Sequence, residues 1–352
     1  MKVGALLPPA AGLVLGAIAG WLCSRLGTPI PWMMGPLVAV ALLRVGGANV
    51  SAIPGGRQIG QWIIGTALGL YFTPAVVREV AGWWPLLAMG AVFAIGVGYV
   101  GGIALARLAS IDRTTAIFAS VPGGAAEMAV LGERFGARVD RVASAQSLRV
   151  IIVVTTVPTA YALLGVHGAD PYVPGTATFS MPGFGLLMGA TAIGGLVGMA
   201  MRVPNAFVLG ALAVAIPLTA MEINLSAMPT VASNAGQCLL GCALGARFER
   251  DFLHGAPRFV VAVSVTVIGA ILISAAFGWV AAELAGLHPA TIALGMAPGG
   301  VAEMSITAKV LQLGVPLVTS FHVVRVVALL LCTAPLFARV QAWRQRRVES
   351  RK

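Results

Sequence analysis

Long apolar stretches separated by short polar gaps run along the whole chain. Each stretch has about 20 residues, the length that a helix needs to cross the hydrocarbon core of a bilayer. The pattern therefore predicts an all-α integral membrane protein. The predicted segments are residues 5–26, 29–46, 58–73, 80–106, 114–133, 141–164, 183–201, 204–221, 230–246, 258–285, 289–312 and 316–338.

The composition agrees with a membrane protein and argues against a soluble one. Hydrophobic residues make up 58% of the 352 residues and charged residues only 10%, whereas soluble domains contain about 25% charged residues. The formal charge of +11 comes from cations in the short gaps, a distribution that orients bacterial inner-membrane proteins. We therefore expect the lipid bilayer as a partner, no nucleic-acid partner and no soluble catalytic domain.

Neither the cysteines nor the histidines predict a metal or cofactor site. The four cysteines, Cys23, Cys238, Cys242 and Cys332, lie inside apolar stretches without zinc-binding or disulfide spacing. The four histidines are spread along the chain, whereas oxygen chemistry on copper or iron needs several clustered ligands. We therefore expect buried thiols, no metal centre and no cofactor.

The strongest signal is an internal duplication. The block Pro122–Met128 (PGGAAEM) recurs 176 residues later as Pro298–Met304 (PGGVAEM), and near the start of each half the offset becomes 175. The longer offset also relates Gln61 to Gln237, Gly65 to Gly241, Thr115 to Thr291 and Arg149 to Arg325. We predict two six-segment repeats, at residues 1–166 and 183–338, with a periplasmic linker at 167–182 and a basic cytoplasmic tail at 339–352.

Positive charge indicates how the two repeats are oriented. If all twelve segments crossed the membrane, the cluster Arg247, Arg250 and Arg258 would lie outside, against the positive-inside rule. If residues 114–133 and 289–312 instead enter and leave on one side, each repeat crosses five times and nearly all cations fall inside. The sequence thus predicts inverted repeats with about ten transmembrane helices, two re-entrant or broken helices, and both termini in the cytoplasm.

Both of these segments contain a Pro-Gly-Gly sequence in their middle. Proline removes a helix donor and glycine weakens a helix, so we expect a break in each. Backbone groups freed at membrane depth need protein or a water-filled cavity around them, and such breaks mark the substrate site of many secondary transporters. The break residues are Pro122, Gly123, Gly124, Pro298, Gly299 and Gly300. An alternative stays open, in which the broken helix crosses fully and another segment does not.

Five ionisable residues lie near the breaks at membrane depth. Glu127 and Glu303 fall in the first turn of the returning helix, where they are either a proton, cation or substrate site or caps that stabilise the break. Arg149 and Arg325 lie roughly 12 Å into their helices at 1.5 Å per residue. Each needs a partner, which is one of the two glutamates or a substrate carboxylate or phosphate. His322 replaces a glutamine of the first copy and is either a protonatable group or a structural residue.

Uncharged polar residues in the same segments are candidates to line a cavity or to bond across helices. They are Gln61, Ser144, Gln146, Asn234, Gln237 and Ser320. Gln61 and Gln237 begin short glycine-rich segments at matching positions of the two copies.

These motifs resemble the bacterial AbrB membrane family. The resemblance rests on Pro31–Pro36 (PWMMGP), on the two Pro-Gly-Gly-x-Ala-Glu-Met blocks and on the duplication, and it covers nearly the whole chain. It implies the fold of inverted-repeat transporters of the cation/proton antiporter and bile-acid symporter kind. Labels used within the family are a regulator of aidB expression and an ammonia monooxygenase, and no catalytic residue is established for it.

Three functions follow as hypotheses. The first is a secondary transporter of a small anionic or zwitterionic metabolite, coupled to protons or sodium through Glu127 and Glu303. The second is a membrane regulator of gene expression that acts indirectly, since no cytoplasmic output domain accompanies the basic tail. The third, an ammonia monooxygenase, is disfavoured by the scattered histidines, so no enzyme activity is expected. Substrate, coupling ion, transport direction and homodimer formation are not specified by the sequence.

Overall fold

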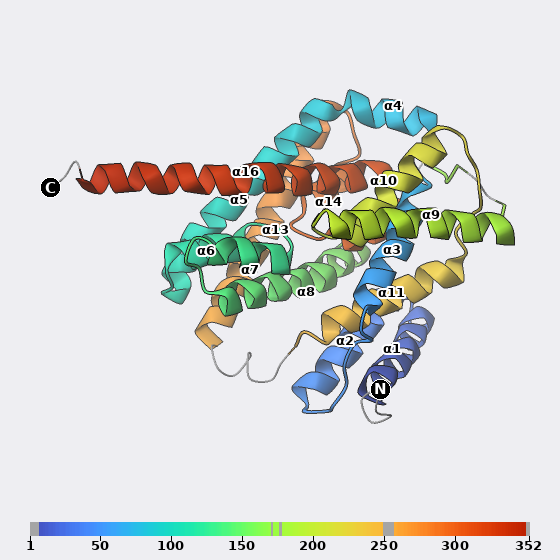
Figure 1. Cartoon of the computed structure of the whole chain (residues 1–352), viewed down its shortest axis with the longest axis horizontal. Helices are drawn as coiled ribbons and strands as arrows, with labels where there is room; N and C mark the ends of the chain where they lie inside the picture. The colour runs from blue at the N-terminus through green and yellow to red at the C-terminus, as the bar shows by residue number, and fades with distance from the viewer. Residues whose placement is uncertain (1–6, 170–171, 176–177, 249–256, 350–352) are drawn as a thin grey trace.

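The structure is a computed structural model that describes residues 7–169, 172–175, 178–248 and 257–349. Within these residues it contains fifteen α-helices and no β-strand (Figure 1). Lys2 and Arg250, which contribute to the predicted orientation, and residues 350–352 of the basic tail lie outside the described residues. The all-helical architecture predicted from the apolar pattern is confirmed.

The helices follow the predicted segments. The first half contains α1 Leu7–Arg25, α2 Pro31–Val45, α3 Gly56–Gly69, α4 Pro74–Gly82, α5 Trp84–Ala109, α6 Arg113–Ser120, α7 Ala125–Glu133 and α8 Val139–Leu163. The second half contains α9 Met181–Ala200, α10 Ala206–Ala220, α11 Thr230–Gly245, α13 Pro257–Ala285, α14 Pro289–Met296, α15 Val301–Val310 and α16 Val315–Glu349. Every predicted segment contains a helix, and residues 114–133 and 289–312 contain two each.

Six of the described helices are long and apolar enough to cross a membrane. They are α1, α5, α8, α9, α13 and the Val315–Cys332 part of α16, and the bent pair α3–α4 passes the same criterion as one segment. Helices α2 and α10 are apolar but have 15 residues each, or about 22 Å at 1.5 Å per residue. The molecule is thus a helical membrane protein. The predicted number of about ten crossings includes helices shorter than the usual 20 residues or so.

Helix α4 is an element that the apolar pattern does not predict. The angle between α3 and α4 is 92°. Thr73 caps α4 by accepting a hydrogen bond from the backbone N–H of Val76 at 3.5 Å, and Pro74 fits the first helical position, where no N–H donor is needed. The helix is short and contains the charged Arg78, so it gives no apolar segment of its own.

Helix α16 continues past residue 338, the predicted end of the last membrane segment, and runs to Glu349. It projects beyond the rest of the molecule as one straight rod (Figure 1). The boundary predicted between the membrane segment and the basic tail therefore falls inside a helix. Arginine and glutamine are good helix formers, so a change in polarity alone does not end a helix.

Each Pro-Gly-Gly sequence separates two short helices, as predicted. Helix α6 ends at Ser120 and α7 begins at Ala125, while α14 ends at Met296 and α15 begins at Val301. The arms have eight to ten residues each, which is too few to cross a bilayer alone.

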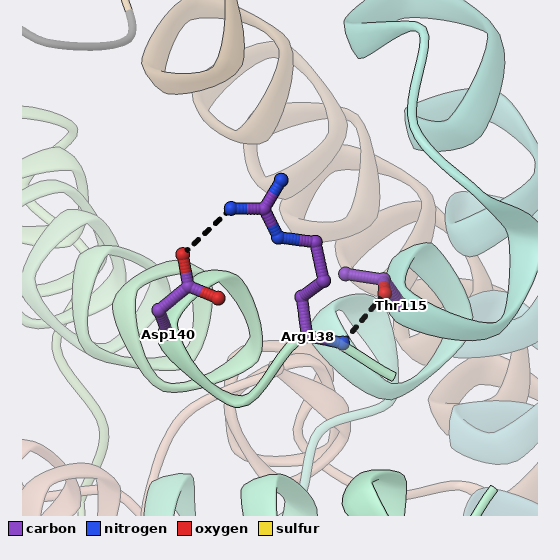
Figure 2. Close-up of polar contacts among 3 residues, drawn as sticks. All are labelled: Thr115, Arg138 and Asp140. Carbon is purple, nitrogen blue, oxygen red and sulfur yellow. Dashed lines mark hydrogen bonds and ion pairs between the residues drawn. The ribbon is translucent and has the colours of Figure 1, made fainter. Parts of the chain in front are cut away.

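The two ends of each broken segment are tied together. The backbone N–H of Arg138, just before α8, donates to Oγ1 of Thr115 in the first turn of α6 at 2.9 Å. Figure 2 shows this contact beside the exposed ion pair of Arg138 with Asp140. In the second half, the N–H of Gly314 donates to Oγ1 of Thr291 at 3.2 Å. Each broken segment therefore folds back as a hairpin, and its start and end lie next to each other.

Backbone geometry recurs in the two halves at the offset of the sequence duplication. Five pairs of matching positions have positive φ, namely Gly27/Arg202, Ile30/Asn205, Gly47/Glu222, Ser110/Gly286 and Gly136/Gln312. Positive φ is uncommon in residues other than glycine, so chance does not account for five pairs. Helix packing recurs as well, because α1 packs on α2 as α9 packs on α10, and α2 packs on α11 as α10 packs on α3.

Helices α3 and α11, which contain matching residues, also pack on each other. A Cβ atom on Gly60 would meet Gly236 and Leu240, and one on Gly56 would meet Leu239. Later positions of α3 therefore face earlier positions of α11, so the two helices are antiparallel. The glycines at the crossing let the two backbones approach closely.

Candidate functional site

Arg149 of α8 bonds two backbone carbonyl groups of the first break. The side chain is 5% exposed, and its guanidinium donates to the carbonyl oxygen of Val121 at 3.3 Å and to that of Gly123 at 3.0 Å. The cation lies beyond the C-terminal end of α6, where the helix dipole is negative. The break thus provides a partner for Arg149 in addition to the two considered from the sequence.

Arg325 of α16 has the same role at the second break. It is 4% exposed and donates to the carbonyl oxygens of Ala297, at 2.7 Å, and of Gly299. Among the described residues, no carboxylate lies within ion-pair distance of Arg149 or Arg325. The Nε atom of each arginine is buried without a hydrogen bond, so each guanidinium keeps a free donor.

The two copies differ beside these arginines. Gln146 Nε2 donates to the carbonyl of Phe118 at 2.8 Å, and Gln146 Oε1 accepts a hydrogen bond from Arg149 at 2.5 Å. His322 occupies the matching position and is fully buried, and neither ring nitrogen forms a hydrogen bond. The first break is therefore fixed by one more side chain than the second.

Packing explains the residue types of the repeated block. A Cβ atom on Gly124 would overlap the Glu127 carboxylate, which folds back over the start of α7, and one on Gly123 would overlap Met128. The second block repeats this packing with Gly299, Gly300, Glu303 and Met304. Each glutamate is the third residue of its helix, where a carboxylate faces the free N–H groups of the first turn. A larger residue at either glycine must displace the glutamate or the methionine.

The two breaks border one cavity of about 50 Å³, which we call the break cavity. Its polar wall consists of Arg57, Gln61, Gly123, Gly124, Arg149, Asn205, Arg247, Gly299, Gly300, Glu303 and Arg325. Space of this size holds a few water molecules or a small ion. The N-terminal ends of α7 and α15 both open onto it, since their first residues line the wall.

Positive charge dominates this cavity. Its four arginines stand against Glu303 in the wall and Glu127, whose carboxylate lies over Gly124 at the rim. The two helix N-termini add partial positive charge. Anions bind at helix N-termini and to arginine forks, so the arrangement is suited to an anion.

A hydrogen-bonded group of side chains forms another part of the wall. Arg57 Nη2 and Gln61 Nε2 both donate to Oδ1 of Asn205, each at 3.1 Å. On the far side, Arg247 Nη1 donates to Oγ of Ser147 at 3.4 Å. These bonds leave further guanidinium donors of Arg57 and Arg247 available to a ligand.

Most of the predicted site residues come together here. Those that line the break cavity are Gln61, Pro122, Gly123, Gly124, Arg149, Gly299, Gly300, Glu303 and Arg325. Pro298 borders an adjoining space of about 20 Å³ together with Pro122 and Arg149. Gln146 and His322 lie behind the arginines, whereas Ser144 and Ser320 do not border the cavity. Asn234 and Gln237 line a different cavity.

Three polar residues of the wall were not among the predicted site residues, namely Arg57, Asn205 and Arg247. Arg57 precedes Gln61 by four residues, and that spacing places both on one face of α3. The sequence indicates Arg57 and Arg247 only as positive charges in the predicted cytoplasmic gaps. No sequence signal relates Asn205 to them, because the contact depends on how α10 packs on α3. Within the described residues, no three His, Cys, Asp or Glu side chains lie close enough to hold a metal ion.

Comparison with known proteins gives matches over nearly the whole chain. A family model described as "Transition state regulatory protein AbrB" matches residues 32–341. The chain is similar to "Uncharacterized protein YhjN" of Bacillus subtilis (strain 168), with 25% identity over 355 residues that cover 92% of this chain and 91% of the relative. It is also similar to "Putative regulator AbrB" of Escherichia coli (strain K12), with 23% identity over 314 residues that cover 88% and 90% of the two chains.

Proposed function

The chain belongs to the AbrB family, and on this premise we propose that it is a secondary-transporter-like protein of the bacterial inner membrane. It moves a small anionic or zwitterionic metabolite and couples this movement to protons or sodium. The observation that carries the proposal is the break cavity, where four arginines meet the N-termini of two broken helices. Paired broken helices form the substrate site of many secondary transporters.

We further propose that the chain consists of two inverted repeats with re-entrant broken helices. The antiparallel packing of α3 on α11 supports the inversion, because these helices contain matching residues. The bond between Arg138 and Thr115 and its counterpart between Gly314 and Thr291 support re-entrant hairpins, because they join the start and end of each segment. Ten crossings require α2, α3, α10 and α11 to span a locally thinner bilayer. Both termini are then cytoplasmic, in agreement with the positive-inside rule.

A small anion suits the cavity better than a cation. Four arginines against two glutamates leave net positive charge, and a buried charge without a partner is costly. The Nε atoms of Arg149 and Arg325 are buried without a hydrogen bond, so they are donors that a carboxylate or phosphate oxygen accepts once the cavity wall rearranges around it. A zwitterion fits if its carboxylate binds the arginines and its ammonium binds Glu303.

The volume of about 50 Å³ limits what the break cavity holds in this conformation. A carboxylate group or an inorganic anion fits that space, whereas a metabolite of ten or more heavy atoms requires a rearrangement of α7 or α15. Such a rearrangement is part of alternating access, in which one group of helices rocks against another. The described conformation therefore corresponds to a closed state of the pathway.

Glu127 and Glu303 are the groups that we propose for ion coupling. Electrostatic attraction links Glu303 to Arg149, Arg247 and Arg325, and links Glu127 to Arg247. Protonation of either glutamate removes a negative charge from the rim of the cavity and raises its positive potential. An anion then binds more tightly, so anion and proton are expected to move together.

A second candidate function is the indirect regulation of gene expression. The matching family description contains the word "regulatory", and the Escherichia coli relative is named a regulator. A transporter that changes the cytoplasmic level of a metabolite alters transcription without an output domain of its own. We propose no enzyme activity for the chain.

Transport is tested in two steps with the purified full-length protein. Small organic acids, amino acids and phosphate are screened for thermal stabilisation, since a ligand at 100 times its Kd stabilises the folded state by about 2.7 kcal/mol. Uptake of each stabilising compound is then measured in proteoliposomes with a proton or sodium gradient. The proteins compared are the wild type, Glu303→Gln, Arg247→Gln and the control Arg113→Gln, whose side chain is exposed at the start of α6.

The wild type and the control are expected to take up the compound. Arg247→Gln is expected to lose about tenfold in affinity, the effect of one charge-assisted hydrogen bond of about 1.4 kcal/mol. Glu303→Gln mimics the protonated glutamate, so it is expected to bind an anion at least as tightly as the wild type and to lose the dependence of uptake on the ion gradient. Equal uptake by all four proteins removes the proposed site. Stabilisation without uptake of any compound contradicts transport and favours a sensory role.

A further inference from the structure

A second cavity, of about 240 Å³, lies between α3, α11 and α15. We call it the outer cavity. Its polar wall consists of Thr230, Ser233, Asn234, Gln237 and Lys309. It shares no lining residue with the break cavity, and the proposed substrate site does not include it.

Matching positions of the duplication line the two cavities. With the residue of the break cavity first, the pairs are Arg57/Ser233, Gln61/Gln237, Leu244/Leu68 and Arg247/Tyr71. Because α3 and α11 are antiparallel, these matching positions lie at opposite ends of the helix pair. Arg57 and Arg247 form one part of the break cavity, at one end of the α3–α11 pair. The outer cavity is the counterpart of that part and lies at the other end of the pair.

Helix α15 connects the two cavities. Its first turn contributes Val301 and Glu303 to the break cavity, and its last turn contributes Ile306 and Lys309 to the outer cavity. Glu303 and Ile306 are three residues apart, or about 4.5 Å along the helix. A ligand that leaves one cavity therefore reaches the other after passing about one helical turn.

Two side chains of the outer cavity are available to a ligand. Ser233 is 5% exposed, and its hydroxyl oxygen has no hydrogen bond, which is uncommon for a buried polar atom. The ammonium nitrogen of Lys309 lies 5.9 Å from the centre of the Tyr71 ring. Among the described residues, no carboxylate lies within ion-pair distance of Lys309. An anion would pair with the ammonium and accept a hydrogen bond from the serine.

The two copies differ in charge at this point. Lys309 occupies the position that Glu133 has in the first copy. The cytoplasmic part of the pathway obtains its positive charge from Arg57 and Arg247, whereas their counterparts in the outer cavity, Ser233 and Tyr71, are uncharged. Lys309 is thus the cation that restores an anion-attracting potential at the outer end.

We infer that the outer cavity is the extracytoplasmic vestibule of the same pathway and binds a small carboxylate or phosphate at Lys309, Ser233 and Gln237. The inference rests on the proposed transport function. In the inverted arrangement the start of α11 follows the outer gap at residues 222–229, so the vestibule opens outward. An anion is attracted there before or after it passes between the helix breaks.

Cysteine accessibility tests the vestibule without knowledge of the substrate. Cys23, Cys238, Cys242 and Cys332 are replaced by alanine, and Asn234→Cys or Thr230→Cys is introduced on the vestibule wall. Gln58→Cys, at the position that matches Asn234, serves as the control for the cytoplasmic side. Val231→Cys, 80% exposed on α11 and absent from the cavity wall, serves as the control for the lipid-facing surface.

The full-length variants in sealed, oriented vesicles are treated from outside with two membrane-impermeant methanethiosulfonates, one anionic (sulfonatoethyl) and one cationic (trimethylammonium-ethyl). We expect Asn234→Cys and Thr230→Cys to react from outside and faster with the anionic reagent. Gln58→Cys is expected to react only from the cytoplasmic side, and Val231→Cys with neither reagent. Adding Lys309→Gln is expected to lower the anionic-to-cationic rate ratio at least about tenfold, as removal of a focusing charge does.

Failure of this inference is distinct from failure of transport. The vestibule assignment is wrong if both wall cysteines are unreactive from outside, or if Lys309→Gln leaves their anionic-to-cationic rate ratio unchanged. This holds even where uptake depends on Arg247. If the labelling pattern holds but no compound is taken up, the vestibule stands as an anion-attracting chamber and the transport proposal is wrong. Uptake by Lys309→Gln supplies a second readout. The apparent affinity of this variant for the transported compound is expected to fall, whereas that of Arg113→Gln is expected to equal the wild-type value.

Discussion

In Arg149 and Arg325, part of the guanidinium bonds the backbone and part of it has no hydrogen bond. Two nitrogens bond carbonyl oxygens of the break, while Nε is buried without a hydrogen bond. The same side chain therefore bonds the break and keeps an unpaired donor, which we propose for ligand binding. Substitution is expected to affect folding and binding together, so stability has to be measured separately from uptake.

Arg149→Ala is expected to lower the free energy of unfolding by about 3 kcal/mol, because the carbonyls of Val121 and Gly123 each lose a bond to a charged donor. Thermal unfolding in detergent measures the change. Arg138→Ala is the matched control, since Arg138 is exposed and paired only with Asp140 on the surface (Figure 2). Its effect is expected to stay below about 1 kcal/mol. Equal losses in the two variants would contradict the structural role of Arg149.

Gly124→Ala is expected to move the Glu127 carboxylate without unfolding the protein. The new methyl group overlaps the flexible end of that side chain and not the backbone, so the carboxylate turns away from the helix N-terminus. The affinity for an anion, measured by thermal shift, is expected to rise by about tenfold, or about 1.4 kcal/mol, because the negative charge of Glu127 no longer lies at the rim of the cavity. Gly189→Ala in α9, where nothing lies near the added methyl, is expected to leave affinity unchanged. Unchanged affinity in both variants would argue against a role for the glutamate position.

The sequence predicts the site residues that recur in both copies better than it predicts the hydrogen-bond partners of those residues. The duplicated Pro-Gly-Gly blocks, Glu303 and Arg325 are found from the sequence because a break or a charge inside an apolar segment is conspicuous. The backbone carbonyl groups that accept hydrogen bonds from Arg325 are not found from the sequence, because every residue has a carbonyl group. Asn205 joins the site only through the packing of α10 on α3, which no local pattern contains.

At the scale of elements, one threonine joins the two ends of each broken hairpin. The hydroxyl oxygen of Thr115 accepts the N–H of Arg138, and that bond closes the hairpin formed by α6 and α7. Proline and glycine explain where the helix stops, but they do not explain why the chain returns to its starting point. The threonine contact supplies this second constraint, and Thr291 supplies it in the second half.

Thr115→Val is therefore expected to destabilise the first hairpin by about 1 kcal/mol, the net contribution of a typical hydrogen bond. The amide of Arg138 is expected to exchange with solvent deuterium faster than in the wild type, because it loses its acceptor. Thr114→Val, at the neighbouring position without such a contact, is the control. Protection of the Arg138 amide that is equal in both variants would show that the hairpin closes by other means.

The extent of the elements is predicted well where apolar residues define it and poorly elsewhere. The apolar segments locate every membrane helix to within a few residues. Helix α4 and the end of α16 are not predicted, because the first is set by the cap at Thr73 and the second continues through arginine-rich sequence. Neither feature changes the hydrophobic pattern on which the prediction rests.

At the scale of the whole molecule, the proposed pathway is built from both copies of the duplicated sequence. The antiparallel crossing of α3 and α11 relates the break cavity to the outer cavity, and α15 runs from one to the other. The copies are equivalent in backbone and different in charge, as Glu133 and Lys309 illustrate. We therefore expect the two ends of the pathway to bind the same anion with different affinities.

The proposed function requires that the break cavity binds a small anion between the two helix breaks. An experimental structure of the full-length protein with the compound that stabilises it most would show this site directly. We expect the anionic group of that compound between Gly124 and Gly300, within hydrogen-bond distance of Arg149 or Arg325. A compound bound elsewhere, with both arginines bonded to backbone carbonyls alone, would contradict it.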